Sequence, residues 1–206
     1  MRGRAGGLVV GAVVVCAAAF AGSAVAGGAP ASKSSTTFNI VRSTGAVASG
    51  CVTAAKATAT IVSSGPVETL TIAAQGLPRH ATFDVFVIQA PNAPFGMSTY
   101  VGAFTTGNQG KATASFVGRF SIATFTVAPG VTDAPAVDAS DATSNPQSMP
   151  VHQLHLGIWF DSPDESVAAG CQNVFTPFNG THSAGPQVLS TRNFAPTNGP
   201  LGRIHP

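Results

Sequence analysis

The chain has 206 residues, of which only 9% are charged, and its formal net charge is +2 at pH 7. With ten basic residues, eight acidic residues and no basic cluster, the composition argues against a nucleic-acid partner or an anionic membrane surface. Hydrophobic residues make up 44% of the chain, enough for one domain with a substantial core.

The first 26 residues have the pattern of a secretory signal peptide. Arg2 and Arg4 precede an apolar run at residues 8–20, and the small-residue sequence AVA at residues 24–26 is typical of a cleavage site. Gly11 interrupts the apolar run, which argues against a retained membrane span. We therefore expect general secretory export, cleavage near Ala26, and a location outside the cell or in the cell envelope.

Cleavage would remove two of the ten basic residues and leave eight basic against eight acidic residues. A near-neutral mature chain favours self-association, which stays open as an alternative. Residues 27–37 are small, polar and contain proline, so they are predicted to form a disordered leader. Residues 38–206 are predicted to form a single domain.

The first strands are expected at Phe38–Arg42 and Cys51–Ser63, the second of which is rich in threonine and valine. The stretch Val67–Gln89 then predicts strand, turn and strand, and we interpret it as a hairpin around which the domain is built. Threonine and alanine alternate with leucine and isoleucine at residues 69–74, which indicates one buried face. Glycine and proline at residues 76–78 indicate a turn.

The return strand at residues 82–89 carries apolar groups on both faces, as expected for a central strand covered on both sides. Asp84 is its one charged residue. Because no partner carboxylate lies near it in the sequence, we expect Asp84 to face the surface or a turn rather than to act as a catalytic acid.

Further strands are predicted at Phe95–Thr105 and at Lys111–Val127, the latter bent or broken into two near Gly118. Residues 129–150 are poor in large apolar groups and predict a long loop, a kind of segment that is usually functional or disordered. His152–Phe160 alternates strongly and predicts another strand.

A short helix is predicted near residues 163–169. Ser162 is placed to cap it, Pro163 takes its first position, Glu165 completes a capping box and Gly170 ends it. Short strands follow at residues 174–176 and 187–191. This succession predicts an all-β fold, namely an antiparallel β-sandwich of immunoglobulin-like or jelly-roll type, or an open barrel.

Two cysteines, Cys51 and Cys171, remain after cleavage of the signal. An even number in an oxidising compartment predicts one disulfide. It would close a loop of about 120 residues, with a nominal stabilisation of roughly 4 kcal/mol in the chain-entropy model. The absence of a C-x-x-C spacing argues against a metal or redox pair.

Histidines and loop acids are the candidates for a metal site. His152 and His155 lie three residues apart on a predicted strand, which points them to opposite faces. With His182 in a loop, a folded cluster stays open, and oxygen ligands in the 129–150 loop would suit calcium. The metal candidates are His152, His155, His182, Asp138 and Asp141. We predict no cofactor.

Aromatic residues form a second candidate site. Phe95, Tyr100, Trp159, Phe175 and Phe178 would suit a carbohydrate or peptide platform, although most of the 13 phenylalanines are expected in the core. The predicted binding surface comprises Tyr100, Trp159 and Phe178.

The runs at residues 76–120, 155–163 and 177–194, beginning with GLPRHATFDVFVIQ, resemble a group of secreted actinobacterial β-rich proteins without an assigned activity. The resemblance covers roughly residues 67–201 and implies export and a β-rich domain. The GLP-x-x-A-x-F-D-V element also resembles the β-sandwich repeats of superoxide-dismutase-like and chordin-type proteins. The metal-binding H-x-H of the dismutases is missing here, so their chemistry does not transfer.

The leading functional hypothesis is an exported, non-catalytic β-sandwich that acts as a binding or structural module with an extracellular or cell-envelope partner. The alternative is a secreted metal-dependent enzyme or hydrolase that uses the histidines and loop acids.

Overall fold

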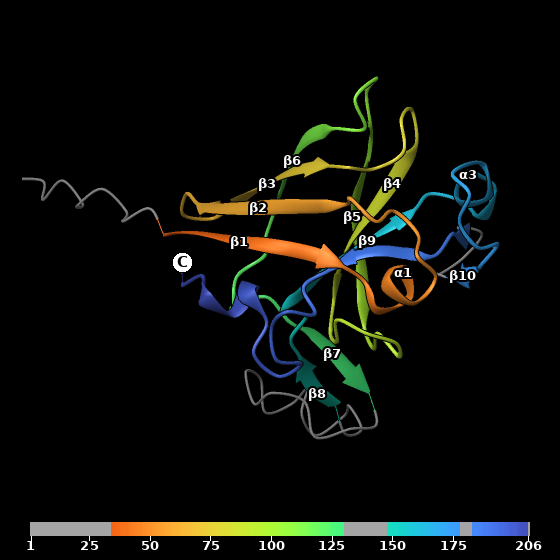
Figure 1. Cartoon of the computed structure of the whole chain (residues 1–206). Helices are drawn as coiled ribbons and strands as arrows, with labels where there is room; N and C mark the ends of the chain where they lie inside the picture. The colour runs from red at the N-terminus through yellow and green to blue at the C-terminus, as the bar shows by residue number, and fades with distance from the viewer. Residues whose placement is uncertain (1–33, 130–147, 178–182, 206) are drawn as a thin grey trace, which may run out of the picture. The chain divides into compact units, whose positions relative to one another are not determined.

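An eight-stranded antiparallel sheet carries the fold in the computed structural model, which describes residues 34–129, 148–177 and 183–205 (Figure 1). The strand order is β5-β4-β9-β12-β1-β2-β3-β6. The bounds are β1 (Ser35–Arg42), β2 (Lys56–Ser63), β3 (Glu68–Gln75), β4 (Thr82–Ile88), β5 (Ser98–Thr105), β6 (Ala112–Gly118), β9 (His155–Phe160) and β12 (Gln187–Ser190). The predicted all-β antiparallel class is confirmed.

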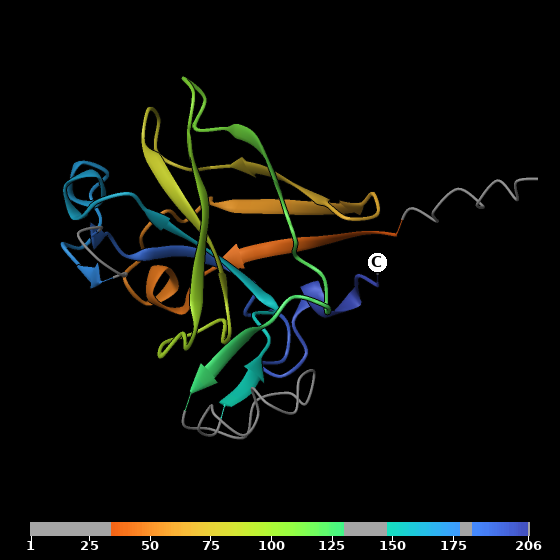
Figure 2. The same ribbon diagram turned by 180° about the vertical axis from the view of Figure 1, so that it is seen from behind.

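Strand β1 joins two halves of this sheet. Residues 35–40 pair with β2, whereas Val41 and Arg42 pair with β12. We call β1-β2-β3-β6 the first half and β5-β4-β9-β12 the second half. Strands β4 and β5 cross β1, β2 and β3 steeply when seen from the front and from behind (Figures 1 and 2). The sheet thus curls into a nearly closed barrel whose facing halves enclose the core, as in orthogonal sheet packing.

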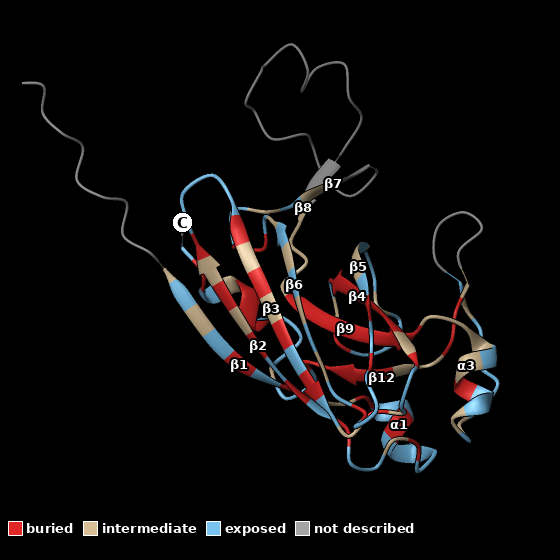
Figure 3. Ribbon diagram, turned by 90° about the horizontal axis from the view of Figure 1, so that it is seen from above, coloured by how far each residue is buried: buried red, intermediate tan, exposed pale blue. Residues whose placement is uncertain are grey.

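Burial follows the residue patterns of the strands (Figure 3). In β3, Leu70 and Ile72 are buried and the intervening threonines are partly exposed, so one face meets the core and the other meets solvent. In β4 and β9 both faces are buried. The prediction of a central strand at residues 82–89 is therefore confirmed.

The predicted hairpin of residues 67–89 is wrong. Strand β3 pairs with β2 and β6, whereas β4 pairs with β5 and β9, so the two strands lie in opposite halves. The segment that connects β3 to β4 makes its hydrogen bonds with the turn between β5 and β6. Leu77 N donates to Gly110 O at 3.2 Å, and His80 N donates to Thr106 O at 3.1 Å. Because the β5–β6 turn supplies these partners, the connecting residues cross the barrel instead of closing a hairpin.

Smaller elements complete the described chain. They are α1 (Thr44–Ala48), β7 (Thr126–Pro129), β8 (Ser148–Val151), α3 (Pro163–Ala168), β10 (Thr176–Pro177), β11 (Ser183–Ala184) and the 3₁₀ helix η1 (Pro200–Arg203). Strand β7 pairs with β8, and β10 pairs with β11. The predicted long strand at residues 111–127 is thus two strands, β6 and β7.

The predicted helix near residues 163–169 is confirmed as α3, with the Ser162 side chain accepting from Glu165 N at 3.3 Å. The carboxylate of Glu165 does not complete a capping box. It accepts from Thr82 N at 2.9 Å and so ties α3 to the start of β4.

Several boundaries differ from the predictions. Strand β1 begins at Ser35, so the predicted leader ends too late, and residues 51–54 form a turn before β2. The disulfide is present: Cys51 and Cys171, 120 residues apart, are bonded with their Cα atoms 5.4 Å apart. Within the residues described, the structure contains no helix long and apolar enough to cross a membrane. The predicted signal peptide lies outside the described residues, as does most of the predicted 129–150 loop.

Candidate functional site

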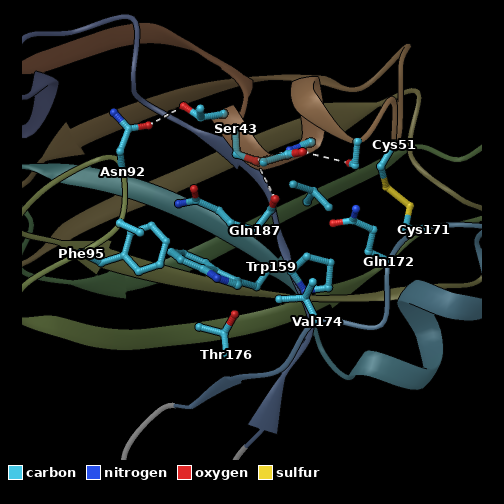
Figure 4. A pocket seen from close by; sticks show the side chains of 17 residues that line it. Ser43, Cys51, Asn92, Phe95, Trp159, Cys171, Gln172, Val174, Thr176 and Gln187 are labelled. Atoms are coloured by element: carbon cyan, nitrogen blue, oxygen red, sulfur yellow. Dashed lines mark hydrogen bonds between the residues drawn. A yellow bond between two sulfur atoms is a disulfide. The ribbon is translucent and has the colours of Figure 1, made fainter.

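A pocket of about 430 Å³ lies against β9 and β12 of the second half (Figure 4). We call it the main pocket. Its walls come from α1, the β4–β5 loop, the segment Cys171–Thr176 and the stretch Pro186–Val188. All of its lining residues are uncharged and most of its surface is apolar.

Trp159 lines this pocket. Gly157 makes room for it, since a Cβ atom at Gly157 would lie 2.3 Å from the Trp159 ring and 2.8 Å from Gln187 Nε2. The indole is covered by Phe95 and Phe86, whose ring centroids lie 5.0 and 5.4 Å away in edge-on geometry. Trp159 is 0% exposed, which corrects the prediction that it belongs to an exposed binding surface.

The β4–β5 loop, Gln89–Met97, holds Phe95 in place. Gln89 N donates to Met97 O, and Ala90 N donates to Phe95 O, both at 2.9 Å. The side-chain oxygen of Gln89 also accepts from Met97 N at 3.1 Å. These bonds close the loop on itself, so the position of Phe95 over Trp159 is fixed by the backbone of the loop.

Ser43 fixes the wall formed by α1. Its hydroxyl accepts from Ala46 N at 3.0 Å, capping the helix, and donates to Gln187 O at 2.6 Å. Its own N–H donates to Val188 O at 2.9 Å. One buried serine therefore both starts α1 and attaches it to β12.

Two links close the sides of the main pocket. Thr44 Oγ1 donates to Asn92 Oδ1 at 2.7 Å, which joins α1 to the β4–β5 loop (Figure 4). On the other side, the Cys51–Cys171 disulfide holds the segment after α3 against the turn that precedes β2. The Ser166 hydroxyl donates to Gln172 O and anchors the same segment to α3.

Gln187 contributes an amide side chain to the lining of the main pocket. Its backbone pairs with Trp159 in the sheet, and its Nε2 is buried without a hydrogen-bond partner among the described residues. Buried polar groups nearly always have partners, so an exception calls for a physical explanation.

A second, more open hollow of about 950 Å³ adjoins the main pocket, and we call it the groove. Phe95 and Thr176 line both hollows. Tyr100, 52% exposed on β5, lines the groove, and its ring centroid lies 5.4 Å from that of Phe86. Phe95, Trp159, Phe86 and Tyr100 thus form a continuous set of ring contacts, the aromatic row.

Carboxylates gather near the Tyr100 end of this row. Asp84 is 0% exposed, so the prediction that it faces the surface or a turn is wrong. It occupies the same face of β4 as Phe86, and this outer face is covered rather than solvated. Burial raises the pKa of the Tyr100 phenol, and the charges of Asp84 and Asp161 raise it further.

Burial also raises the pKa of Glu165. The bond from Thr82 N opposes this shift, and the charge of Asp161 adds to it. The charges of Asp161 and Asp84 therefore act on both Tyr100 and Glu165 at this end of the second half.

The histidines do not converge within the described residues. His155 is buried, with Nδ1 2.9 Å from Thr191 Oγ1 and Nε2 donating to Pro196 O at 3.1 Å. His152 precedes β9, with Nδ1 3.3 Å from Thr124 O. In residues 34–129, 148–177 and 183–205 no group of three or more potential ligands is placed to hold a metal ion.

Some predicted site residues cannot be placed. His182, Asp138, Asp141 and Phe178 lie outside the described residues. Conversely, sequence reasoning missed Ser43, Asn92 and Gln187. A serine three residues before Ala46 is a weak capping signal for a five-residue helix, and the roles of Asn92 and Gln187 depend on contacts across the barrel.

No family model, no curated protein and no solved structure matches this chain.

Proposed function

We propose that this chain is an exported, non-catalytic binding module whose main pocket takes a neutral, largely apolar small molecule. The observation that carries the proposal is the pocket itself: about 430 Å³ of mostly apolar, uncharged surface. Ligand sites typically measure about 300–1,000 Å³ and are lined mainly by apolar and aromatic side chains with a few polar groups.

The charge of the lining sets the class of ligand. A charged group that enters an apolar pocket loses its hydration, and the residues around the main pocket offer no opposite charge in return. Neutral ligands avoid this cost. A ligand oxygen that accepted from Gln187 Nε2 would satisfy the buried amide nitrogen after a rotation of its side chain.

Export is supported by the disulfide and by the signal-like pattern of residues 1–26. Disulfides persist in oxidising compartments and are rare in the cytosol. The alternative of a secreted metal-dependent enzyme or hydrolase gains nothing from His155, because both of its ring nitrogens are engaged in hydrogen bonds. Metal analysis of the purified secreted protein tests this alternative, since stoichiometric bound metal would favour it.

The chain has one tryptophan, so its fluorescence reports on the main pocket. We expect a neutral apolar probe, N-phenyl-1-naphthylamine, to bind and to change the emission of Trp159. The variant Val174→Phe narrows the main pocket and should weaken probe binding on the order of tenfold, which corresponds to about 1.4 kcal/mol.

Val117→Phe is the matched control, since it enlarges an exposed valine on β6 of the first half. We expect this control to bind like the wild type. Failure of the probe and of other neutral apolar compounds to bind, or equal weakening by both variants, would rule the proposal out.

A further inference from the structure

The main pocket and the groove lie next to each other. Phe95 and Thr176 line both, and the aromatic row runs beneath both, from Phe95 to Tyr100. A ligand longer than the main pocket therefore has an apolar path onward along the groove.

Apart from Gln187 Nε2, the path offers few open hydrogen-bonding groups, since several of its hydroxyl and amide groups already have partners. Thr176 Oγ1 donates to Gly185 O at 2.9 Å, and the Thr44 hydroxyl donates to the Asn92 side chain at 2.7 Å. The indole of Trp159 is fully covered and offers no open face for stacking. A sugar chain needs many free hydrogen-bonding groups and exposed ring faces, so this path suits an alkyl chain better than an oligosaccharide.

Charge distinguishes among amphiphiles. The lining of both hollows contains no lysine, arginine or histidine within the residues described. At the Tyr100 end, burial raises the pKa of the phenol, and the negative charges of Asp84 and Asp161 raise it further. An anionic head group would be repelled at this end of the groove.

We propose that the ligand is an uncharged amphiphile with an alkyl or isoprenoid chain, seated with its chain in the main pocket and extending along the groove so that its hydroxyl-type head lies near Ser98 and Tyr100. This inference rests on the proposed function, because it presupposes that the main pocket binds ligand. It adds the length, the direction and the charge of that ligand.

The test is a series of n-alkan-1-ols from butanol to dodecanol, with Trp159 fluorescence as the readout on the full mature chain. Each methylene that becomes fully buried should tighten binding roughly fourfold. The loss of affinity caused by Val174→Phe should stop growing once the alcohol fills the main pocket. In the wild type, we expect binding to keep tightening beyond that chain length, because the remaining methylenes enter the groove.

Variants in the groove separate the two proposals. Tyr100→Ala should weaken dodecanol severalfold and leave hexanol unchanged, and Tyr100→Phe should restore dodecanol binding because it restores the ring contact with Phe86. Phe125→Ala, which truncates an exposed aromatic ring outside both hollows, should change neither.

Charge is tested with dodecanoate at the same chain length, which should bind at least tenfold more weakly than dodecanol. If short alcohols bind and Val174→Phe blocks them while longer chains gain nothing, the further inference is overturned and the proposed function stands. Dodecanoate binding as tight as dodecanol, or preferential binding of cellohexaose, also overturns the inference. If no neutral compound perturbs Trp159, both proposals fall.

Discussion

The outer faces of the two halves of the sheet differ sharply. On the first half, hydroxyls from neighbouring strands pair across the surface: Thr37 with Thr60 at 3.0 Å, and Thr71 with Ser115 at 2.9 Å. On the second half, the corresponding face buries Phe86, Ile88 and Trp159 beneath a loop and small strands. One face is solvated, and the other is covered by a second apolar cluster.

This difference shows how a chain with 9% charged residues divides the outer surface of its sheet into a solvated face and a covered face. Threonine suits an exposed sheet face because it combines a strand-favouring shape with a hydroxyl group. The second half departs from this alternation, so it needs further segments to cover it. The main pocket lies where α1, the β4–β5 loop and the segment after α3 meet over that face.

The largest effect on the free energy of unfolding is expected when one side chain from each outer face is truncated and the two losses are compared. Trp159→Ala should lower the free energy of unfolding by about 3–5 kcal/mol, because it empties the centre of the second cluster. Val117→Ala, at a residue 72% exposed on the first half, should change it by less than about 0.5 kcal/mol. Urea denaturation followed by circular dichroism measures both, and similar values would remove the contrast between the faces.

Loss of the disulfide should follow in size. The double variant Cys51→Ser, Cys171→Ser should lower the free energy of unfolding by roughly 2–4 kcal/mol, because the cross-link restricts a long loop of the unfolded chain. Dithiothreitol should shift the wild-type urea midpoint and leave the double variant unchanged. A wild-type midpoint that does not respond to reduction would show that the disulfide contributes no stability.

Gly157→Ala tests the space beneath the indole. The new methyl group would collide with the Trp159 ring and the Gln187 amide, so we expect a loss of about 1–3 kcal/mol and altered tryptophan fluorescence. Gly45→Ala is the control, since a Cβ there meets nothing within 4 Å. An unchanged stability for Gly157→Ala would mean that the indole moves aside freely.

Gln187→Leu should have a smaller effect on the free energy of unfolding, and in the opposite direction from the preceding variants, which lower it. Replacing a buried amide nitrogen that lacks a partner with an apolar group should leave the stability unchanged or raise it by about 1 kcal/mol. Thermal unfolding and the N-phenyl-1-naphthylamine titration, run in parallel, show whether stability and ligand binding change in opposite directions. A clear loss of stability would indicate that the amide makes a favourable contact in the free protein.

The smallest expected effect is on the dependence of stability on pH. Burial lowers the pKa of His155 in the folded protein, partly opposed by hydrogen bonding to backbone carbonyls such as that of Pro196. Below the unfolded pKa of about 6.5, the unfolded chain therefore binds more protons, and stability falls as the pH falls towards the lowered folded pKa. Unfolding curves at pH 7.5 and 5.5 measure this, and His155→Gln should reduce the difference between them.

Local features of the fold were predictable because they depend on neighbouring residues. The alternation at residues 69–74 identified the buried face of β3, and Ser162-Pro163 identified the start of α3. Strand pairing was not predictable in this way. Strands β3 and β4 are consecutive and separated by a turn, yet their partners come from distant segments, so the hairpin prediction was wrong.

The candidate site likewise combines a feature that the sequence predicted with one that it did not. Tyr100 was predicted as a surface aromatic and is exposed, whereas Trp159 was grouped with it and is buried. Both residues lie in strand-forming segments that contain aromatic or β-branched residues, and the two segments look alike in the sequence. Their burial depends on the β4–β5 loop, which folds over one and leaves the other open.

The sequence by itself determined the strand-forming segments, the small helix α3 and the pairing of the two cysteines that follow the predicted signal, because periodicity, caps and cysteine number are properties of the chain. The tertiary structure alone decided that β3 and β4 lie in opposite halves, that Asp84 is buried, and that α1, Asn92 and Gln187 meet at a pocket. These outcomes arise from hydrogen bonds and packing between residues far apart in the chain, and no local pattern records which distant partner a residue will find.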